Sequence, residues 1–446
     1  MKKALFISYY FPPVSSAYSL RVLKFAKQLA KHDWQPIIIT DTPKSYYFKD
    51  NFLLDEAERS SLRIERTKGS KKNLLTGSKL QKLPNEGKLK LIRNIKRLFK
   101  LPDEQKVWIN KCVKLCSEII EREKISVLYA TAPPFSSFVA AAELKEKYGI
   151  PLVIDYQDSW LHSATNNFYL GYHKLRNVRM EMEVLRVADE VLTANRRIKE
   201  NIISEYIHIS HKDINVMLHG IDFIDFNVKP KPRDDSRIRF TYAGTFFDYR
   251  SPKYFFEALS MVFKKKPELR KKIDACLVGT LSRENLQLIK KFGIADVITN
   301  PGFVNHSECM SYLLSSDVLW FTINKDDGDD AISPVKLSEY FGARKPILGL
   351  VSDGAAKQLL KEYESVKICE PDDPEEISNM IIEYCGQFES RTVEPVNEAY
   401  VRNFDIVRQS YQLVRYFEFL IDINPEFDII GREELRQSIN TGYDFL

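Results

Sequence analysis

The sequence predicts an α/β protein with two doubly wound parallel sheets that face a cleft. Short apolar runs alternate with amphipathic segments along most of the chain, as in proteins built from repeated βαβ units. The length of 446 residues exceeds what one hydrophobic core usually serves, so two domains are expected. A charged, proline-containing stretch at 229–236 is typical of a joint between domains.

The chain opens with a complete βαβ unit. An apolar strand is predicted at 2–8, and a proline- and serine-rich loop follows at 11–19. An amphipathic helix comes next, because several apolar residues share one helical face: Val22, Phe25, Ala26 and Leu29. Ligands of doubly wound sheets lie at the carboxyl ends of the strands, so the loop is predicted to line a site.

Further strands are predicted in both halves, with helices between them. In the first half they fall near 36–40, 62–65, 126–130, 151–155, 189–193 and 214–217. In the second half they fall near 238–243, 273–278, 297–299, 317–322, 346–350 and 366–369. The predicted organisation is an N-terminal domain at 1–228 with a basic insertion at 61–100, a second domain at 237–395, a C-terminal helix at 396–421, and an acidic tail at 422–446.

The stretch SPVKLSEYFGARKPILGL couples a helix start to a buried strand. Ser333 is a good N-cap, Pro334 suits the first helical position, and Gly342 can end the helix. The free N–H groups at such a start typically face a phosphate.

Two charged residues of this helix point to a ligand. Lys336 lies in the first turn, where a cation is unfavourable unless an anion arrives to meet it. Glu339, one turn further on, can accept hydrogen bonds from two hydroxyls of a ribose. The alternative is an ordinary βαβ helix with a solvated lysine and glutamate.

The net charge of +5 conceals a strong asymmetry. The window 61–100 contains thirteen Lys or Arg and two acids, so it carries +11 and the rest of the chain −6. Within it, 88–100 has apolar residues at helical spacing, namely Leu91, Ile92, Ile95, Leu98 and Phe99. Such a helix can lie in an anionic membrane surface, or it can pack on the core with a solvated basic face. Nucleic acid is disfavoured, because no binding motif or interleaved aromatic residues accompany the charge.

The remaining composition favours a cytoplasmic protein. The six cysteines lack zinc-like spacing, and Cys112 and Cys116 have no His or Cys pair nearby. Reduced, buried thiols are typical of the cytoplasm. The N-terminus runs directly into a strand, so no signal peptide is expected, and no apolar segment reaches transmembrane length.

Characteristic segments recur in a fixed order over most of the chain. They are FISYYFPPVSSAYSLRVLKFAKQL, LYATAPPFSSFVAAAEL, IPLVIDYQDSW, VADEVLTAN, LHGIDFIDF, FTYAGTFFDYRSP, the VGTLS turn, SSDVLWFTI and the Lys336–Glu339 helix. In this order and spacing the chain resembles glycosyltransferase family 4, the retaining enzymes of the GT-B fold that use nucleotide-sugars. It particularly resembles bacterial members that build surface polysaccharides. The resemblance implies two Rossmann-like domains, with the C-terminal helix crossing back to the first.

The resemblance implies that the second domain binds a UDP- or GDP-linked sugar without a cofactor or metal. Gly244 ends a strand where a backbone can approach a phosphate closely. Arg250 and Lys336 would neutralise the departing diphosphate, although Arg250 can also be a surface arginine at a helix start. The predicted donor site comprises Gly244, Thr245, Arg250, Val304, Ser333, Lys336, Leu337 and Glu339.

The acceptor side is predicted in the first domain. Asp155 and Asp158 follow a buried strand and are expected to face the cleft as the catalytic pair, with Asp158 near the family's catalytic or orienting residue. A retaining transfer needs no protein nucleophile, because the leaving phosphate acts as base while side chains position the acceptor hydroxyl. The alternative for Asp158 is capping of the Trp160 loop. The acceptor-side residues are Ser15, Ser16 and Arg21, with His162, His219 and Asp222 as further candidates.

Two departures from the family pattern stand out. Relatives carry glycines where this chain has Ser15 and Ser16, and Ala331 replaces the first carboxylate of a Glu-x7-Glu pattern that ends at Glu339. Asp329 and Asp330 lie beside that position. The KDDGDD run, with its acids at 326–330, suggests a metal site, but a solvated acidic loop is the favoured interpretation.

Three functional hypotheses follow. The leading one is a cytoplasmic retaining glycosyltransferase, peripheral at the inner face of the plasma membrane, that extends a saccharide or polyprenyl-linked acceptor in cell-surface polysaccharide biosynthesis. The second is a noncatalytic GT-B-like scaffold of a polysaccharide assembly complex. The third is a nucleotide-sugar epimerase.

Overall fold

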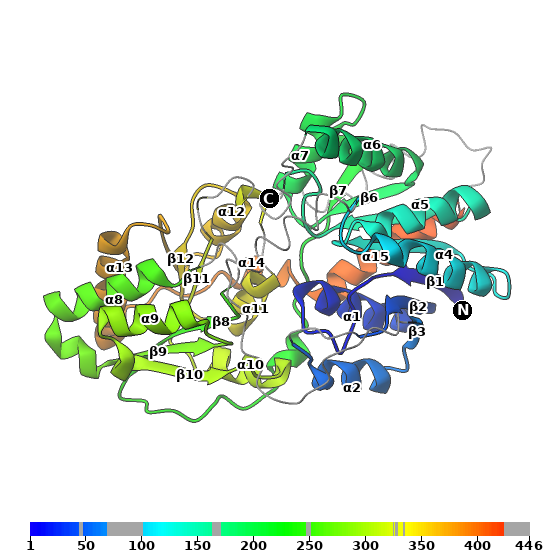
Figure 1. The fold of residues 1–446 in the computed structure, drawn as a ribbon. Coiled ribbons are helices and arrows are strands. Elements are labelled where there is room, and N and C mark those ends of the chain that lie inside the picture. Colours follow the sequence, from blue (N-terminus) through cyan, green and yellow to red (C-terminus); the bar gives the residue numbers. More distant parts are fainter. Residues whose placement is uncertain are drawn as a thin grey trace. The chain divides into compact units, whose positions relative to one another are not determined.

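The computed structural model describes the chain in two compact units. It describes all residues except 44–47, 69–100, 163–170, 247–250, 324, 326–328, 333–334 and 423–446. The first unit comprises Met1–Gly220 and the C-terminal segment from Ile406, and the second comprises Ile221–Asp405 (Figure 1). The predicted joint at 229–236 lies inside the second unit, because the chain passes between the units at 220–221 and again at 405–406.

The first unit is built on a parallel sheet of seven described strands. They are β1 (Lys2–Ile7), β2 (Trp34–Asp41), β3 (Arg63–Thr67), β4 (Val127–Ala132), β5 (Leu152–Tyr156), β6 (Glu190–Thr193) and β7 (Ile214–Val216). Their order is β3-β2-β1-β4-β5-β6-β7, so the winding reverses between β1 and β4. Strands covered on both faces read as continuous apolar runs, which is why the sequence predicted them well.

Helices cover both faces of this sheet. They are α1 (Ala17–Leu29), α2 (Asn51–Arg59), α4 (Lys106–Ile120), α5 (Ser136–Tyr148), α6 (Gly171–Val187), α7 (Arg196–Glu205) and α15 (Ile406–Asp422). The predicted apolar face of α1 is fully buried. Helix α15 packs beside α1, where Phe417 contacts Phe6 and Trp34 with ring centres 6.3 and 5.2 Å apart. The C-terminal helix therefore returns to the first sheet.

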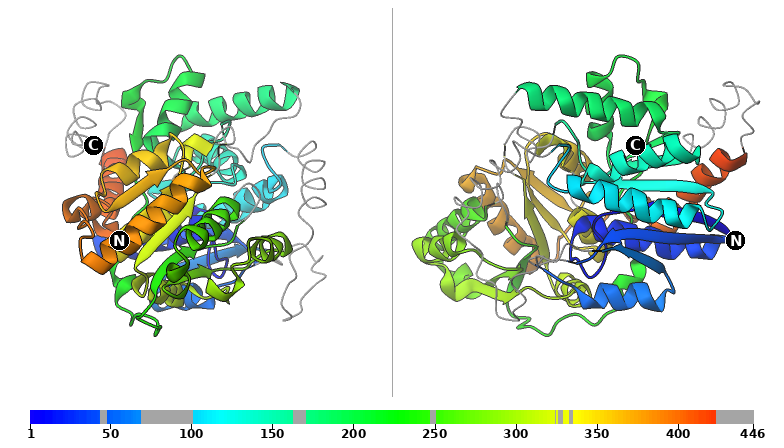
Figure 2. Two further views of the ribbon diagram at one scale, coloured as in Figure 1. Left: turned by 90° about the vertical axis from the view of Figure 1, so that its left-hand side faces the viewer. Right: turned by 45° about the vertical axis from the view of Figure 1, so that its right-hand side comes forward.

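The second unit has a parallel sheet of six described strands. They are β8 (Ile238–Ala243), β9 (Ile273–Val278), β10 (Ile298–Gly302), β11 (Val318–Thr322), β12 (Ile347–Leu350) and β13 (Val366–Cys369), in the order β10-β9-β8-β11-β12-β13. Its helices are α8 (Lys253–Lys265), α9 (Arg283–Phe292), α10 (His306–Leu314), α11 (Val335–Ala343), α12 (Ala355–Lys361), α13 (Pro374–Ser390) and α14 (Glu398–Arg402). In Figure 2 the strands of each sheet lie side by side, with helices packed against the sheet.

The predicted fold class is confirmed, with local corrections at the C-terminal side. The expected single helix at 396–421 is two helices, α14 and α15, and the compact units divide between them. Gly342 does not end its helix but lies within α11, where a β-carbon would come within 2.9 Å of Ile221. Arg344 takes the left-handed conformation after the helix instead, with φ of 53°. The predicted basic helix at 88–100 lies outside the described residues.

Candidate functional site

The winding of the second sheet reverses between β8 and β11, and helix α11 is tied to this point. The Tyr340 hydroxyl accepts a hydrogen bond from the Ala243 N–H at 2.9 Å and donates one to the Trp320 carbonyl at 3.1 Å. These bonds fix α11 to the end of β8 and to β11. Ligands of open α/β sheets bind at the carboxyl ends of strands beside such a reversal.

Lys336 and Gly244 meet at this point. Gly244 follows β8 with φ of 131°, and a β-carbon there would stand 3.0 Å from Cε of Lys336, with the ammonium closer still. The same ammonium lies 3.9 Å from the centre of the Tyr242 ring, a cation–π distance. The structure therefore brings together two residues that are 92 positions apart, and only glycine leaves room for the lysine.

Two further glycines line the same edge. Gly279 follows β9 with φ of 147°, and its missing β-carbon would come within 2.7 Å of the Gly244 carbonyl carbon. Gly302 ends β10 with φ of 78°. The Asn300 side-chain amide donates a hydrogen bond to the Gly279 carbonyl at 2.8 Å. A glycine at the end of each of three neighbouring strands was visible in the sequence, and that pattern would have indicated a backbone-lined edge.

Glu339 belongs to a chain of three side chains. Nδ1 of His306 lies 3.6 Å from Glu339, and Nε2 of the same ring lies 3.0 Å from Asp225. The His306 side chain is only 9% exposed. His306 begins α10, and Asp225 lies in the short helix η3 (Phe223–Phe226). Neither residue was predicted from the sequence, because no local pattern connects them to Glu339.

Gly342 explains how η3 comes close enough for this contact. A β-carbon at Gly342 would stand 2.5 Å from the Phe226 ring, so glycine lets η3 pack directly on α11. The side chain of Asp222 caps η3 by accepting from the Ile224 N–H at 3.2 Å. The packing of η3 on α11 therefore places Asp225 within reach of His306.

The other predicted donor residues have different surroundings. Thr245 and Val304 are half-buried in the loops after β8 and β10. Leu337 is 2% exposed, so its side chain belongs to the core, and only its backbone can meet a ligand. Arg250 and Ser333 lie outside the described residues. Ala331 is buried at the end of the short helix η6 (Asp329–Ala331).

Asp155 corrects the predicted acceptor side. It was expected to face open space, but it is fully buried and bonds the Arg21 guanidinium at 2.7 and 3.0 Å. Tyr129 also donates a hydrogen bond to it. Burial opposes the charge of Arg21, but Asp155 and Tyr129 together more than compensate and raise the pKa of Arg21. We therefore assign Asp155 a structural role.

Arg21 completes this buried network. It lies in α1 rather than in the preceding loop, and it donates to the carbonyls of Leu218 and Met217 at 2.8 and 2.9 Å. It also lies 3.4 Å from Nδ1 of His219, which is itself buried. Arg21 therefore joins α1, β5 and the segment after β7, and its side chain serves the fold.

The loop residues around α1 present a different surface. Asp158 is half-buried and accepts a hydrogen bond from the Tyr18 hydroxyl, and Tyr18 stacks on Tyr10 with ring centres 5.8 Å apart. Ser16 caps α1 by accepting from the Ser19 N–H at 3.1 Å, and the Ser15 N–H donates to the Phe48 carbonyl at 3.3 Å. The two serines therefore shape the loop that leads into α1, whose residue Tyr18 bonds Asp158.

The chain is similar to one family model and to several proteins of known structure. Residues 223–392 match the family model described as glycosyl transferases group 1. Sucrose-phosphate synthase from Thermosynechococcus elongatus is 12% identical, with a TM-score of 0.67 over 94% of this chain and 99% of that one. HepE from Anabaena, solved in complex with UDP, is 15% identical, with a TM-score of 0.64 over 94% and 100%.

Epimerases share the fold as well. UDP-GlcNAc 2-epimerase from Neisseria meningitidis, bound to UDP-GlcNAc, is 11% identical, with a TM-score of 0.56 over 93% of this chain and 99% of that one. No curated protein sequence matches the chain significantly. The chain therefore has the GT-B fold of two Rossmann-like domains, and residues 223–392 are similar to glycosyl transferases group 1.

Proposed function

We propose that the protein is a retaining glycosyltransferase that moves a sugar from a UDP- or GDP-linked donor to a saccharide or polyprenyl-linked acceptor in cell-surface polysaccharide biosynthesis. The observation that carries this proposal is the Lys336 ammonium held against Gly244 where the second sheet reverses its winding. The family match to 223–392 supports it, because that segment contains this site. HepE, a structural neighbour, has been solved with UDP-glucose, which supports a nucleotide-sugar donor.

The residues of this edge suit a nucleoside diphosphate. Lys336 would stabilise the charge that develops on the departing diphosphate, and Gly244 leaves the backbone open to a phosphate oxygen. Glu339 would accept hydrogen bonds from the ribose hydroxyls. His306 lies 3.6 Å from Glu339 and would orient the carboxylate toward those hydroxyls.

Asp158 is the proposed positioning residue for the acceptor. In a retaining transfer through an ion-pair-like path, the leaving phosphate takes the acceptor proton, so the protein needs only to orient the hydroxyl. Asp158 has an oxygen to accept from that hydroxyl, and Tyr18 holds the carboxylate from α1. The neighbouring Tyr10 ring would give a sugar an apolar face to pack against.

A nucleotide-sugar epimerase is the second candidate, favoured by the structural likeness to UDP-GlcNAc 2-epimerases. Both enzymes would bind the donor, so the reaction products must separate them. The purified protein should be incubated with UDP- and GDP-sugars, with and without short saccharide and polyprenyl-phosphate sugar acceptors. Acceptor-dependent release of UDP or GDP with an elongated product supports transfer. An isomerised nucleotide-sugar formed without an acceptor would instead establish epimerisation, and failure to bind any donor would favour a scaffold.

We further propose peripheral attachment at the cytoplasmic face of the membrane through 88–100. The proposal rests on the basic and apolar pattern of the sequence, because this segment lies outside the described residues. None of the described helices is long and apolar enough to span a membrane. Sedimentation with anionic vesicles at low and high salt tests the proposal. Binding that ignores a change of Lys96, Arg97 and Lys100 to Gln would contradict it.

A further inference from the structure

A polar pocket lies in the second unit at the amino ends of the strands, opposite the end that carries Gly244. Its volume is about 440 Å³. It is bordered by the segment that leads into β8 and by residues that directly precede β11 and β12. The six-residue strand β8 separates it from Gly244, which at about 3.3 Å per residue is roughly 20 Å. A ligand of this pocket would therefore be distinct from the nucleotide that we propose to bind at Gly244.

The lining carries an excess of positive charge. Lys231, Arg233 and Lys345 line the pocket together with a single acid, Asp235. Two of the three cations already have partners. Lys231 pairs with Glu308 at 2.6 Å. Arg233 pairs with Asp317 through two N–H groups, one of them at 2.9 Å, and with Asp235 at 3.3 Å.

Lys345 is the exception. Among the residues that the structure describes, its ammonium has no hydrogen-bond or ion-pair partner, although the side chain is half-buried. Burial lowers the pKa of Lys345, and Arg233 adds to this effect, while Asp317 opposes it. A partly desolvated cation costs free energy unless an anion compensates it.

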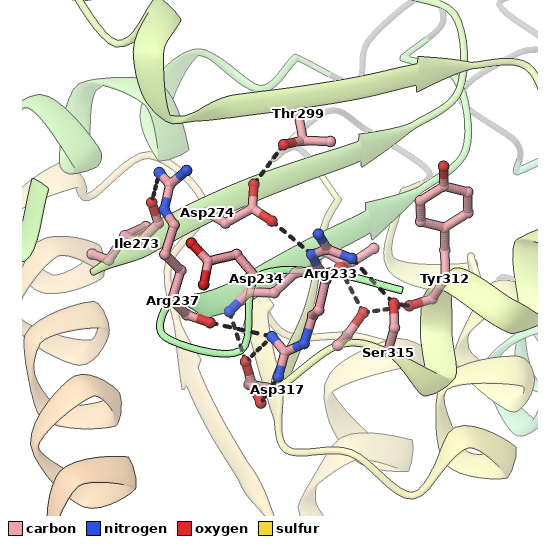
Figure 3. A network of polar contacts seen from close by, with 12 residues as sticks. Arg233, Asp234, Arg237, Ile273, Asp274, Thr299, Tyr312, Ser315 and Asp317 are labelled. Atoms are coloured by element: carbon pink, nitrogen blue, oxygen red, sulfur yellow. Dashed lines mark hydrogen bonds and ion pairs between the residues drawn. The ribbon is translucent and has the colours of Figure 1, made fainter. Parts of the chain in front are cut away.

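The Arg233 side chain of the lining belongs to a polar network. Asp317 accepts hydrogen bonds from the Arg233 guanidinium (Figure 3). It also accepts one from the backbone N–H of Arg239 at 2.8 Å. Arg239 in turn bonds Asp274 at 2.6 Å and the Ser315 hydroxyl at 3.2 Å. These bonds fix the Arg233 guanidinium before any ligand arrives, so little conformational entropy would be lost on binding.

We propose that this pocket binds a small phosphate-bearing molecule, with Lys345 as its cationic contact. A phosphate fits the observations because it is a compact anion with several acceptor oxygens, and clustered cations recognise such groups. The volume suits a small molecule. The site is separate from the proposed donor site and does not depend on it.

Inorganic phosphate is the probe, titrated into the full-length protein by calorimetry. The titrations use a Lys336→Gln background, which removes the cation at Gly244. We expect Lys345→Gln to weaken phosphate binding at least tenfold and Lys345→Arg to keep most of it. Lys361→Gln, an exposed lysine on α12, is the matched control and should bind phosphate like the parent.

Three outcomes would overturn the proposal. The first is that phosphate binds equally well with and without the Lys345 ammonium. The second is that phosphate fails to bind at millimolar concentration. The third is that the parent binds phosphatidic acid vesicles and Lys345→Gln does not, while free phosphate never binds. That result would assign the site to a lipid headgroup. Thermal melting checks that each variant folds, and UDP binding to Lys345→Gln with native Lys336 reports separately on the donor site.

Discussion

Lys336 places its ammonium in the space that a β-carbon at Gly244 would occupy. The contact joins the first turn of α11 to the end of β8, and the Tyr242 ring beneath holds the cation at 3.9 Å. A cation in the first turn opposes the helix dipole, so the arrangement is stabilised when an anion binds beside the lysine. This pair is the centre of the proposed donor site.

The first prediction concerns His306. His306→Ala removes the ring that bridges Asp225 and Glu339. Glu339 then loses its support, and nucleoside diphosphate binding should weaken about three- to tenfold, which corresponds to a polar contact worth roughly 1 kcal/mol. Calorimetry with UDP and GDP measures the change. His208→Ala, an exposed histidine of the first unit, is the control. Equal affinities for His306→Ala and the parent would show that the bridge does not serve the ligand.

The second prediction concerns Asp155. Asp155→Asn leaves the buried Arg21 without its counter-ion, so the free energy of unfolding should fall by about 3–5 kcal/mol in urea titrations. Asp296→Asn breaks the exposed pair with Arg270 and should cost less than about 1 kcal/mol. A variant at Asp155 that keeps full stability but loses transfer would restore the catalytic interpretation.

The sequence predicted the strands because both faces of each sheet are covered. Apolar runs such as those of β11 and β12 are recognisable without any knowledge of their neighbours. Lys336 was singled out for a local reason as well, since a cation in the first turn of a helix is anomalous by itself.

Long-range partners could not be predicted in the same way. Asp155 looked like a strand-end carboxylate, but its partner Arg21 lies 134 residues away in the sequence. His306 and Asp225 are separated by 81 residues, and only the packing of η3 on α11 brings them together. Gly342 resembled a helix terminator, because the sequence does not show that a neighbouring ring needs the space of its side chain.

The third prediction concerns pH. Glu181 in α6 is 2% exposed, and burial raises its pKa from the ordinary 4.5 to about 8, although the Tyr206 hydroxyl bonds it at 2.9 Å. The folded protein therefore holds a proton that the unfolded chain releases. The contribution of Glu181 to stability is fully present below about pH 4.5 and is lost as pH rises to about 8, by roughly 1.4 kcal/mol per pH unit between these values.

Glu181→Gln should remove this dependence. The unfolding free energy of the variant, measured in urea between pH 5 and pH 9, should rise relative to the parent as pH increases. Glu118→Gln, at an exposed position on α4, is the control and should follow the parent. Parallel pH curves for the parent and Glu181→Gln would contradict the assignment of a proton to the folded state.

The fourth prediction concerns metal ions. Because Lys336 and Arg250 are proposed to neutralise the leaving diphosphate, transfer should continue in the presence of a chelator. The rate is measured with excess EDTA and again after magnesium or manganese is added. Complete loss of activity that either metal restores would shift this role to the acidic residues at 326–330.

The most direct test of the proposed donor site is to measure nucleoside diphosphate binding to variants of the two charged residues of α11, Lys336 and Glu339. UDP and GDP should be titrated by calorimetry into the parent, Lys336→Ala, Glu339→Ala and the control Lys361→Ala. We predict that the parent and the control bind one of the two nucleotides equally well. Lys336→Ala and Glu339→Ala should each lose roughly 1.5–3 kcal/mol, about ten- to a hundredfold in affinity. Unchanged affinity in both variants would contradict the assignment of the donor site to Gly244, Lys336 and Glu339.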